Sequence, residues 1–261
     1  MKRSAPTSGA EAGPDTVGLR MLRVLEQVAG SEKPLSISEI AEALELPRPT
    51  AHRICARLEE LGYCMREPGQ KLLAAGPRLQ TLAISALRND GRRSERRAIL
   101  AALVEKVDET CNFTMLSGHE VLYIDRVEAH WPLRLQLEPG SRVPLHCTAS
   151  GKLLLTFQSA SRRKRLLAAL DFRAHTPNSI TSRKALEAEI EAIRRQGYSL
   201  DREEFLLGMA AIAAPVLNKR REAVAAIACH APVARMSLEQ AVRNLPAVQE
   251  AAEAIAATLS S

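Results

Sequence analysis

The sequence predicts a multidomain protein, in which a mostly helical winged helix-turn-helix domain is joined by a linker helix to a larger α+β domain. Three observations predict this fold class. Residues 17–62 show three short amphipathic helices separated by turn signals, and strand-like residues around a turn follow them. From Cys111 onward, short β-like runs alternate with helical stretches, as in an antiparallel sheet that carries helices. The chain has 261 residues, which is enough for two domains.

The first two helices carry recognisable start signals. Asp15 or Thr16 can cap the first helix, and the residues 30–34 end it. Ser36 and Glu39 have the spacing of a capping box, so a second short helix is expected to begin there. The apolar residues of the first helix fall at helical spacing: Val17, Leu19, Leu22, Leu25 and Val28.

The third helix has one apolar and one basic side. Residues 46–48 form the turn before it, and Pro49 suits its first position because the missing N–H would be unpaired there anyway. The apolar side is centred on Ile54, next to Ala51, Leu58 and Leu61. Residues 48–57 include three Arg and one His but no acid. A small, cationic outer face of this kind suits the major groove of DNA.

The residues after this helix predict the wing. Gly62 ends the helix, residues 63–65 can start a strand, residues 67–70 form a turn, and residues 71–73 can return. The DNA-binding domain is therefore expected at 15–76, after a disordered arm at 1–14. The competing interpretation is a small helical core with a solvated, charged surface.

Charge supports a polyanionic partner only locally. The formal net charge is +6, but the first ninety residues contain 12 Lys and Arg against 11 Asp and Glu, a net of 12 − 11 = +1. The DNA-binding hypothesis therefore depends on how charge is separated on one helix rather than on bulk charge.

The cysteines and the hydropathy pattern predict a cytoplasmic protein. The five Cys are scattered and include no Cys-x-x-Cys, which fits reduced thiols better than a disulfide framework. No run reaches eighteen apolar residues, and the first fourteen residues lack the apolar core of a signal peptide. We therefore expect no membrane association.

A linker helix is expected at 77–97 and the α+β domain at 98–261. The linker is the most basic segment, and five of its arginines could contact DNA backbone or an acidic partner, or form a solvated face: Arg88, Arg92, Arg93, Arg96 and Arg97. Beyond it, strands are expected at 112–116, 121–127, 133–137, 198–200, 210–217 and 223–229. Helices are expected at 150–157, 162–170, 183–196 and 238–259.

A second group of candidate functional residues lies at 143–155, where a strand ends and a helix begins. Free backbone N–H groups at a helix start can bind a carboxylate or a phosphate. Ala149, Ser150 and Gly151 are small enough to let a ligand approach closely. The stretches 201–204 and 208–215 offer further small lining residues, so a pocket for a modest organic acid is one interpretation. Ordinary capping by Thr148 and tight alanine packing is the other.

Together these two groups resemble the IclR family of bacterial transcriptional regulators. The resemblance covers nearly the whole chain from about Val17 and is carried by the stretches 35–41, 46–53, 58–63, 145–152 and 208–215. It implies an N-terminal winged helix, a linker helix, a GAF-like effector domain, and homodimers or tetramers on double-stranded operator DNA. It implies neither catalysis nor a cofactor.

The resemblance marks Arg48, Thr50, His52 and Arg53 as DNA-reading residues. The helical wheel agrees for His52 and Arg53 but places Thr50 nearer the core, which favours a phosphate-binding or capping role there. Pro49 stands where the family usually has a serine, so one phosphate contact is in question. The candidate DNA-binding residues are Ser36, Arg48, Pro49, Thr50, His52, Arg53, Arg57 and Lys71.

The resemblance also points to an effector pocket. Ala211 replaces a common cysteine, and His230 replaces a small hydroxyl residue. His230 could pair with an anionic ligand or sense pH if its pKa is near neutrality, and an exposed, idle side chain is the alternative. The candidate effector-binding residues are Leu135, Val143, Ala149, Ser150, Gly151, Asp201, Ala211, Ala228 and His230.

The sequence thus predicts a ligand-responsive transcription factor that controls a catabolic operon, for example as a repressor, in response to a small organic acid. A metal- or redox-responsive regulator that uses His146/Cys147 and Cys229/His230 is the alternative. Because strand neighbours point to opposite faces, each pair offers at most one inward ligand. An enzyme built on Ser150 and His146 is not expected, because no nucleophile-elbow pattern is present.

Overall fold

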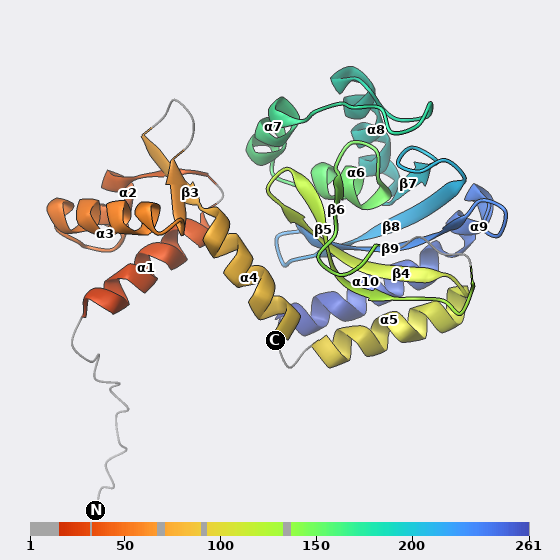
Figure 1. Cartoon of the computed structure of the whole chain (residues 1–261), viewed down its shortest axis with the longest axis horizontal. Helices are drawn as coiled ribbons and strands as arrows, with labels where there is room; N and C mark the ends of the chain where they lie inside the picture. The colour runs from red at the N-terminus through yellow and green to blue at the C-terminus, as the bar shows by residue number, and fades with distance from the viewer. Residues whose placement is uncertain (1–15, 32, 67–70, 90–92, 133–136, 261) are drawn as a thin grey trace, which may run out of the picture. The chain divides into compact units, whose positions relative to one another are not determined.

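The computed structural model describes residues 16–31, 33–66, 71–89, 93–132 and 137–260 (Figure 1). The chain divides into two compact units, one up to Ala83 and one from Ile84 onward. The expected arm at 1–14 and the first four residues of the strand expected at 133–137 lie outside the described residues. No helix within the described ranges is both long and apolar enough to cross a membrane.

The N-terminal unit consists of three helices and a small antiparallel sheet. The helices are α1 (Val17–Gly30), α2 (Ile37–Ala43) and α3 (Arg48–Glu60). The sheet has the order β1-β3-β2, with β1 (Leu35–Ser36), β2 (Cys64–Arg66) and β3 (Leu72–Ala75). Helix α4 (Pro77–Asn89) follows and crosses the boundary between the units. The sequence patterns predicted every one of these elements except β1.

The expected helix starts are confirmed in this unit. The hydroxyl of Thr16 accepts a hydrogen bond from the N–H of Leu19, and Ser36 and Glu39 form a complete capping box. Helix α3 begins one residue earlier than expected, so Pro49 occupies its second position. That position also tolerates proline, because its N–H has no intrahelical partner.

Glycines shape the wing. Gly62 ends the α3 segment with a φ of 76°, in the left-handed region that glycine adopts without strain. At Gly76, a Cβ atom would lie 2.4 Å from the carbonyl oxygen of Gly62. The end of β3 can therefore pass close to the turn after α3 only because residue 76 has no side chain.

The C-terminal unit is built on a six-stranded antiparallel sheet with the order β6-β5-β4-β9-β8-β7. The strands are β4 (Thr110–Ser117), β5 (Glu120–Val127), β6 (Arg142–Pro144), β7 (Ser199–Arg202), β8 (Met209–Leu217) and β9 (Ala223–Pro232). The helices are α5 (Arg93–Val107), α6 (Ala149–Thr156), α7 (Ala160–Ala169), α8 (Arg183–Gln196), α9 (Leu238–Arg243) and α10 (Leu245–Ser260). The GAF-like α+β architecture expected from the sequence is confirmed.

Helices cover both faces of this sheet (Figure 1). Helices α5 and α10 pack on one face, where Leu100 and Ile255 meet strand residues such as Ile227. Helices α6 and α8 lie on the other face, where Leu153 packs near Ala226. Successive side chains of β9 pack on opposite faces of the sheet, as the period-2 geometry of a strand requires. Alanines on the α6 side let this helix approach the sheet closely.

Two expectations about helices are wrong. The terminal helix is interrupted at Asn244, because Pro246 lacks the N–H that would continue the hydrogen-bond ladder of α9. The basic segment is not simply a solvated or DNA-contacting face. Arg96 is fully buried, its Nε lies 3.3 Å from Asp125 Oδ2, and Arg93 Nε lies 3.3 Å from Asp125 Oδ1.

Candidate functional site

The N-terminal half of α3 presents basic side chains to the surface. Arg48, His52 and Arg53 are exposed, and no side-chain hydrogen bond or ion pair involves them among the described residues. Ala51 and Ile54, on the opposite side, are buried in the core of the unit, as the wheel predicted. The helix is therefore held by its apolar stripe, and its basic groups remain available to a ligand.

The other candidate DNA-binding residues are less free. Arg57 Nη1 donates to Glu60 Oε2 at 2.7 Å, and Ser36 is engaged in the capping box of α2. Thr50 is half-buried, in agreement with its predicted place near the core, while Pro49 and Lys71 are exposed. Arg48, His52 and Arg53 are therefore the strongest candidates for contact with DNA.

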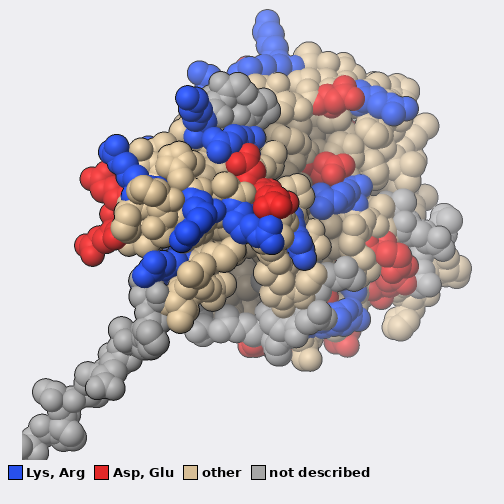
Figure 2. All heavy atoms as spheres, turned by 60° about the vertical axis from the view of Figure 1, so that its left-hand side comes forward, with Lys and Arg blue, Asp and Glu red and all other residues tan. Residues whose placement is uncertain are grey.

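The wing is anchored to this helix. Arg66 in β2 donates from Nε to both carboxylate oxygens of Glu59 in α3, at 3.0 and 3.1 Å. Figure 2, in which the N-terminal unit comes forward, shows Lys and Arg side chains interspersed with acidic ones. The surface in this view is thus not uniformly basic, which agrees with the small net charge of the first ninety residues.

A cleft with a volume of about 40 Å³, partly open to solvent, lies where the start of α6 faces strands β5, β7, β8 and β9. It combines apolar side chains with a few hydroxyl, imidazole and carboxyl groups. Its lining consists of Tyr123, Thr148, Ala149, Ser150, Asp201, Phe205, Leu206, Met209, Ala210, Ala211, Ala228 and His230.

Six of the nine candidate effector-binding residues line this cleft: Ala149, Ser150, Asp201, Ala211, Ala228 and His230. Val143 is instead buried in the core beneath α6. Gly151 serves helix packing, because a Cβ there would lie 2.5 Å from the carbonyl oxygen of Leu145. Leu135 lies outside the described residues.

The sequence patterns missed the larger residues of the lining. Tyr123 comes from the middle of β5, and only the pairing of distant strands brings it to α6. Phe205 and Leu206 follow β7 in a loop without a regular period. Met209 did fall within one of the small-residue stretches that the sequence singled out. Thr148 was recognised only as a helix cap, and it does cap α6 through its hydroxyl.

Asp201 is the acidic group of the cleft. Its Oδ1 accepts hydrogen bonds from the N–H of Glu204 at 2.7 Å and of Phe205 at 3.4 Å. Burial outweighs these contacts and raises the pKa of Asp201 to about 7. The carboxyl group can therefore exchange a proton near neutral pH.

His230 lies in a different environment from the exposed, idle side chain that was one sequence-based interpretation. Its side chain is buried, and Nδ1 lies 2.8 Å from Asn112 Nδ2. Burial, together with the charges of Arg126 and Arg235, lowers the pKa of His230 to about 3. The imidazole is consequently neutral at physiological pH. The exposed, idle side chain is therefore wrong, and so is a sensor that titrates near neutrality, whereas pairing with an anionic ligand stays a prediction.

A buried lysine helps to hold the walls of the cleft together. Lys152 in α6 is fully buried and forms ion pairs with Glu204 and with Glu189, the latter at 3.2 Å. Arg202 also reaches Glu189, at 2.9 Å. Because Glu204 directly precedes Phe205, this network fixes α6 and the loop after β7 to each other.

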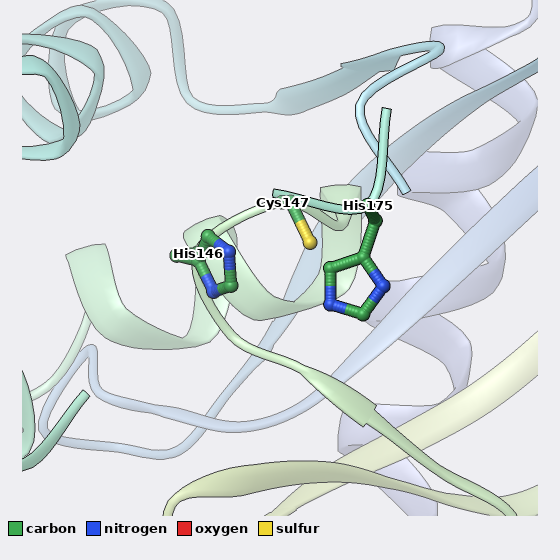
Figure 3. Close-up of side chains that lie close together, drawn as sticks. All are labelled: His146, Cys147 and His175. Atoms are coloured by element: carbon green, nitrogen blue, oxygen red, sulfur yellow. The ribbon is translucent and has the colours of Figure 1, made fainter. Parts of the chain in front are cut away.

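The metal or redox alternative is not favoured in the form predicted. Cys229 packs in the core on the α5/α10 side, opposite Cys111, while His230 is bonded to Asn112. All five cysteines are free and buried. In the described ranges, His146 and Cys147 instead share a cluster with His175 (Figure 3).

Comparison with known proteins agrees with this architecture. Residues 85–257 match the family model described as "Bacterial transcriptional regulator IclR C-terminal", and residues 19–68 match the "IclR helix-turn-helix domain". The chain belongs to the IclR family of bacterial transcriptional regulators. As an IclR-family regulator it is not an enzyme, which confirms the sequence-based prediction.

Individual relatives cover almost the whole chain. It is 44% identical over 244 residues to the probable transcriptional regulator SauR of Cupriavidus necator, with 94% of this chain and 97% of that protein covered. The crystal structure of Thermotoga maritima IclR is 27% identical, with a TM-score of 0.63, and covers 93% of this chain and 98% of that one. An IclR homologue complexed with 4-hydroxybenzoate from Microbacterium hydrocarbonoxydans has the same fold, at 24% identity and a TM-score of 0.58, over 94% of this chain and 99% of that one.

Proposed function

We propose that this IclR-family regulator binds operator DNA through the exposed face of α3 and changes its DNA affinity when a small organic acid occupies the cleft beside α6. The observation that carries the proposal is the pairing, in one chain, of exposed basic side chains at the start of α3 with a partly enclosed cleft that holds a protonatable carboxyl group. The proposal includes control of a catabolic operon by a homodimer or tetramer located in the cytoplasm.

The α3 face supports DNA recognition by its length and chemistry. In helix-turn-helix proteins, the N-terminal residues of the second helix of the motif contact base edges in the major groove. Arg53 lies in the second turn of α3, and a guanidinium can make a bidentate contact with guanine. Arg48 lies at the first position of the helix, where a phosphate contact is favoured by both its charge and the free N–H groups.

The cleft supports an acidic ligand of modest size. Its lining combines small and apolar side chains with a few polar groups, as small-molecule sites do. The first turn of α6, capped by Thr148, lines it and directs the positive end of the helix dipole toward it. A protonated Asp201 can donate a hydrogen bond to a carboxylate. The 4-hydroxybenzoate complex of the Microbacterium homologue provides an example of such an effector in the same fold.

The DNA-binding half of the proposal is tested by fluorescence anisotropy on promoter fragments from the source genome, first with the full chain. Arg53→Ala should weaken binding to the selected fragment by about 1–3 kcal/mol. Arg183→Ala, which removes an exposed arginine from α8, is the matched control and should bind normally. Equal affinity for the two variants would contradict the assignment of α3.

The effector half is tested by thermal shift with a panel of aromatic and short aliphatic carboxylates. We expect at least one acid to stabilise the protein and to alter promoter binding. Ala211→Leu, which fills the cleft, should abolish that response, whereas Ala185→Leu on the exposed face of α8 should retain it. A response that survives in Ala211→Leu would place the effector elsewhere, and a panel without any response would contradict an acid effector.

A further inference from the structure

A cluster of metal-binding side chains lies outside the residues that line the cleft. The ligand atoms of His146, Cys147 and His175 all lie within 4.8 Å of one another. Figure 3 shows the sulfur of Cys147 between the two imidazole rings. We propose that these three residues form a binding site for a single Zn²⁺ ion, or for a divalent metal of similar preference, with the fourth position open to water.

The donor set matches the chemistry of zinc. Two imidazole nitrogens and one thiolate are borderline-soft ligands, which zinc prefers over the oxygen ligands of Mg²⁺ and Ca²⁺. In a tetrahedral site with these bond lengths, ligand atoms lie about 3.3–3.6 Å apart. The cluster therefore has to contract by about 1 Å. His175 is exposed, so its side chain can make this adjustment at little cost.

The backbone explains why two adjacent residues can both bind one ion. In a strand, neighbouring side chains point to opposite faces, but residues 145–148 form a bend between β6 and α6. The bend is fixed on both sides, because Leu145 is fully buried and Thr148 caps α6. His146 and Cys147 are thus held in place before any ion arrives.

The imidazole of His146 has the orientation that a ligand requires. Its Nε2 lies 2.9 Å from the carbonyl oxygen of Arg173. A carbonyl oxygen only accepts hydrogen bonds, so Nε2 carries the proton and Nδ1 keeps its lone pair. Metal-binding histidines commonly donate their second N–H to a backbone carbonyl in this way.

A surface cavity gives the ion a route to the cluster. The cavity has a volume of about 260 Å³, is partly open to solvent, and is lined by both His146 and His175. Asp171 and Glu120 also line it, so acidic groups stand near the opening. The cavity has room for the water that completes the coordination.

The site would connect two segments that both reach the effector cleft. Cys147 directly precedes Thr148, and the ring of His175 packs against Phe205 with centroids 5.4 Å apart. Both Thr148 and Phe205 line the cleft. A bound ion would therefore restrain two walls of the cleft against each other.

The proposal is tested on the reduced full chain, without effector or DNA, by titration with Co²⁺ and by competition of Zn²⁺ with a chromophoric chelator. We expect one ion per chain and a thiolate-to-cobalt charge-transfer band. His175→Ala should lower the affinity about ten- to hundredfold. His119→Ala, an exposed histidine that lines the same cavity, is the matched control and should bind like the natural chain.

Three results would overturn the site: no binding at micromolar metal, a cobalt complex without a thiolate band, or equal affinity of the His175→Ala and His119→Ala variants. Cys147→Ala should abolish the band. Should this buried substitution prevent folding, the thiolate band of the natural chain and its loss in His175→Ala still decide the question. Neither outcome depends on an effector, so the effector proposal is tested separately.

Discussion

Two arginine-bearing helices use the same side chain in opposite ways. In α3, Arg53 is exposed and has no bonded partner among the described residues. In α5, Arg96 is fully buried between Asp125 and the ring of Phe113, whose centroid lies 5.5 Å from the guanidinium carbon. Each helix contains three arginines, yet the guanidinium of Arg53 is exposed while that of Arg96 is buried. The two arginines differ because Arg96 has a carboxylate partner, Asp125, on a strand that is distant in the sequence.

The contrast predicts where charge contributes to stability and where it is left for a ligand. A buried guanidinium that loses its carboxylate, or the reverse, leaves an uncompensated charge in a low-dielectric interior. An exposed arginine loses little on truncation, because water already solvates it. The four predictions below test this division, from the largest expected effect to the smallest.

Asp125→Ala should lower the free energy of unfolding of the C-terminal unit by about 3–5 kcal/mol, because it removes the carboxylate that forms an ion pair with the buried Arg96. Urea unfolding followed by the fluorescence of Trp131, the single tryptophan, measures this. Glu187→Ala, which breaks the exposed pair with Arg183, is the control and should change stability by less than about 0.5 kcal/mol. Similar losses in the two variants would remove the distinction between buried and exposed pairs.

Asp201→Asn should change how stability depends on pH. Because burial raises the pKa of Asp201 from 3.8 to about 7, its contribution is fully present below pH 3.8 and is lost as the pH rises through about 7. Between these values the natural chain should lose up to about 1.4 kcal/mol per pH unit relative to Asp201→Asn. Denaturant unfolding from pH 5 to 8 measures the difference, with the exposed Asp171→Asn as control. Parallel pH profiles for natural chain and variant would show that Asp201 is ionised throughout.

Arg48→Ala should reduce the salt dependence of operator binding. Each phosphate contact contributes about 0.9 to the slope of log K against log salt, so the variant should lose about that amount. Anisotropy titrations at several salt concentrations give the slope. An unchanged slope would exclude Arg48 from the phosphate contacts.

Arg57→Ala should have the smallest effect. Its guanidinium is shared with Glu60 in an exposed pair three residues apart, and such pairs contribute at most about 0.5 kcal/mol. Unfolding of the variant and its promoter affinity should both stay close to those of the natural chain. A loss of affinity as large as that of Arg53→Ala would show that Glu60 releases Arg57 on DNA.

Local signals account for most of what the sequence could predict. The caps at Thr16 and Ser36 act through residues three positions away, so reading the chain in order is enough to find them. The wheel around Ile54 succeeded for the same reason. Ala149, Asp201 and Ala211 of the cleft lie in stretches that local patterns singled out, whereas Ala228 and His230 came from family resemblance.

Long-range contacts account for what the sequence could not predict. The two-residue strand β1 exists because Leu35 pairs with Leu73, and no local pattern marks it. Arg96 could not be placed inside the protein without knowing that Asp125 lies next to it. The cluster of His146 and Cys147 gained its third member, His175, from a loop 28 residues after Cys147. Each of these features depends on pairing that forms only when the sheet is assembled.

Gly151 restricts which ligand preferences related chains can acquire. Any side chain at this position would collide with the backbone of Leu145, so the first turn of α6 would have to shift and the wall that it gives to the cleft would shift with it. Ala211 stands on the opposite wall, where a larger group takes up ligand space without displacing a helix. Related chains can therefore change their ligand preference by substitutions on the strand side of the cleft, but not by a substitution at Gly151 in the first turn of α6.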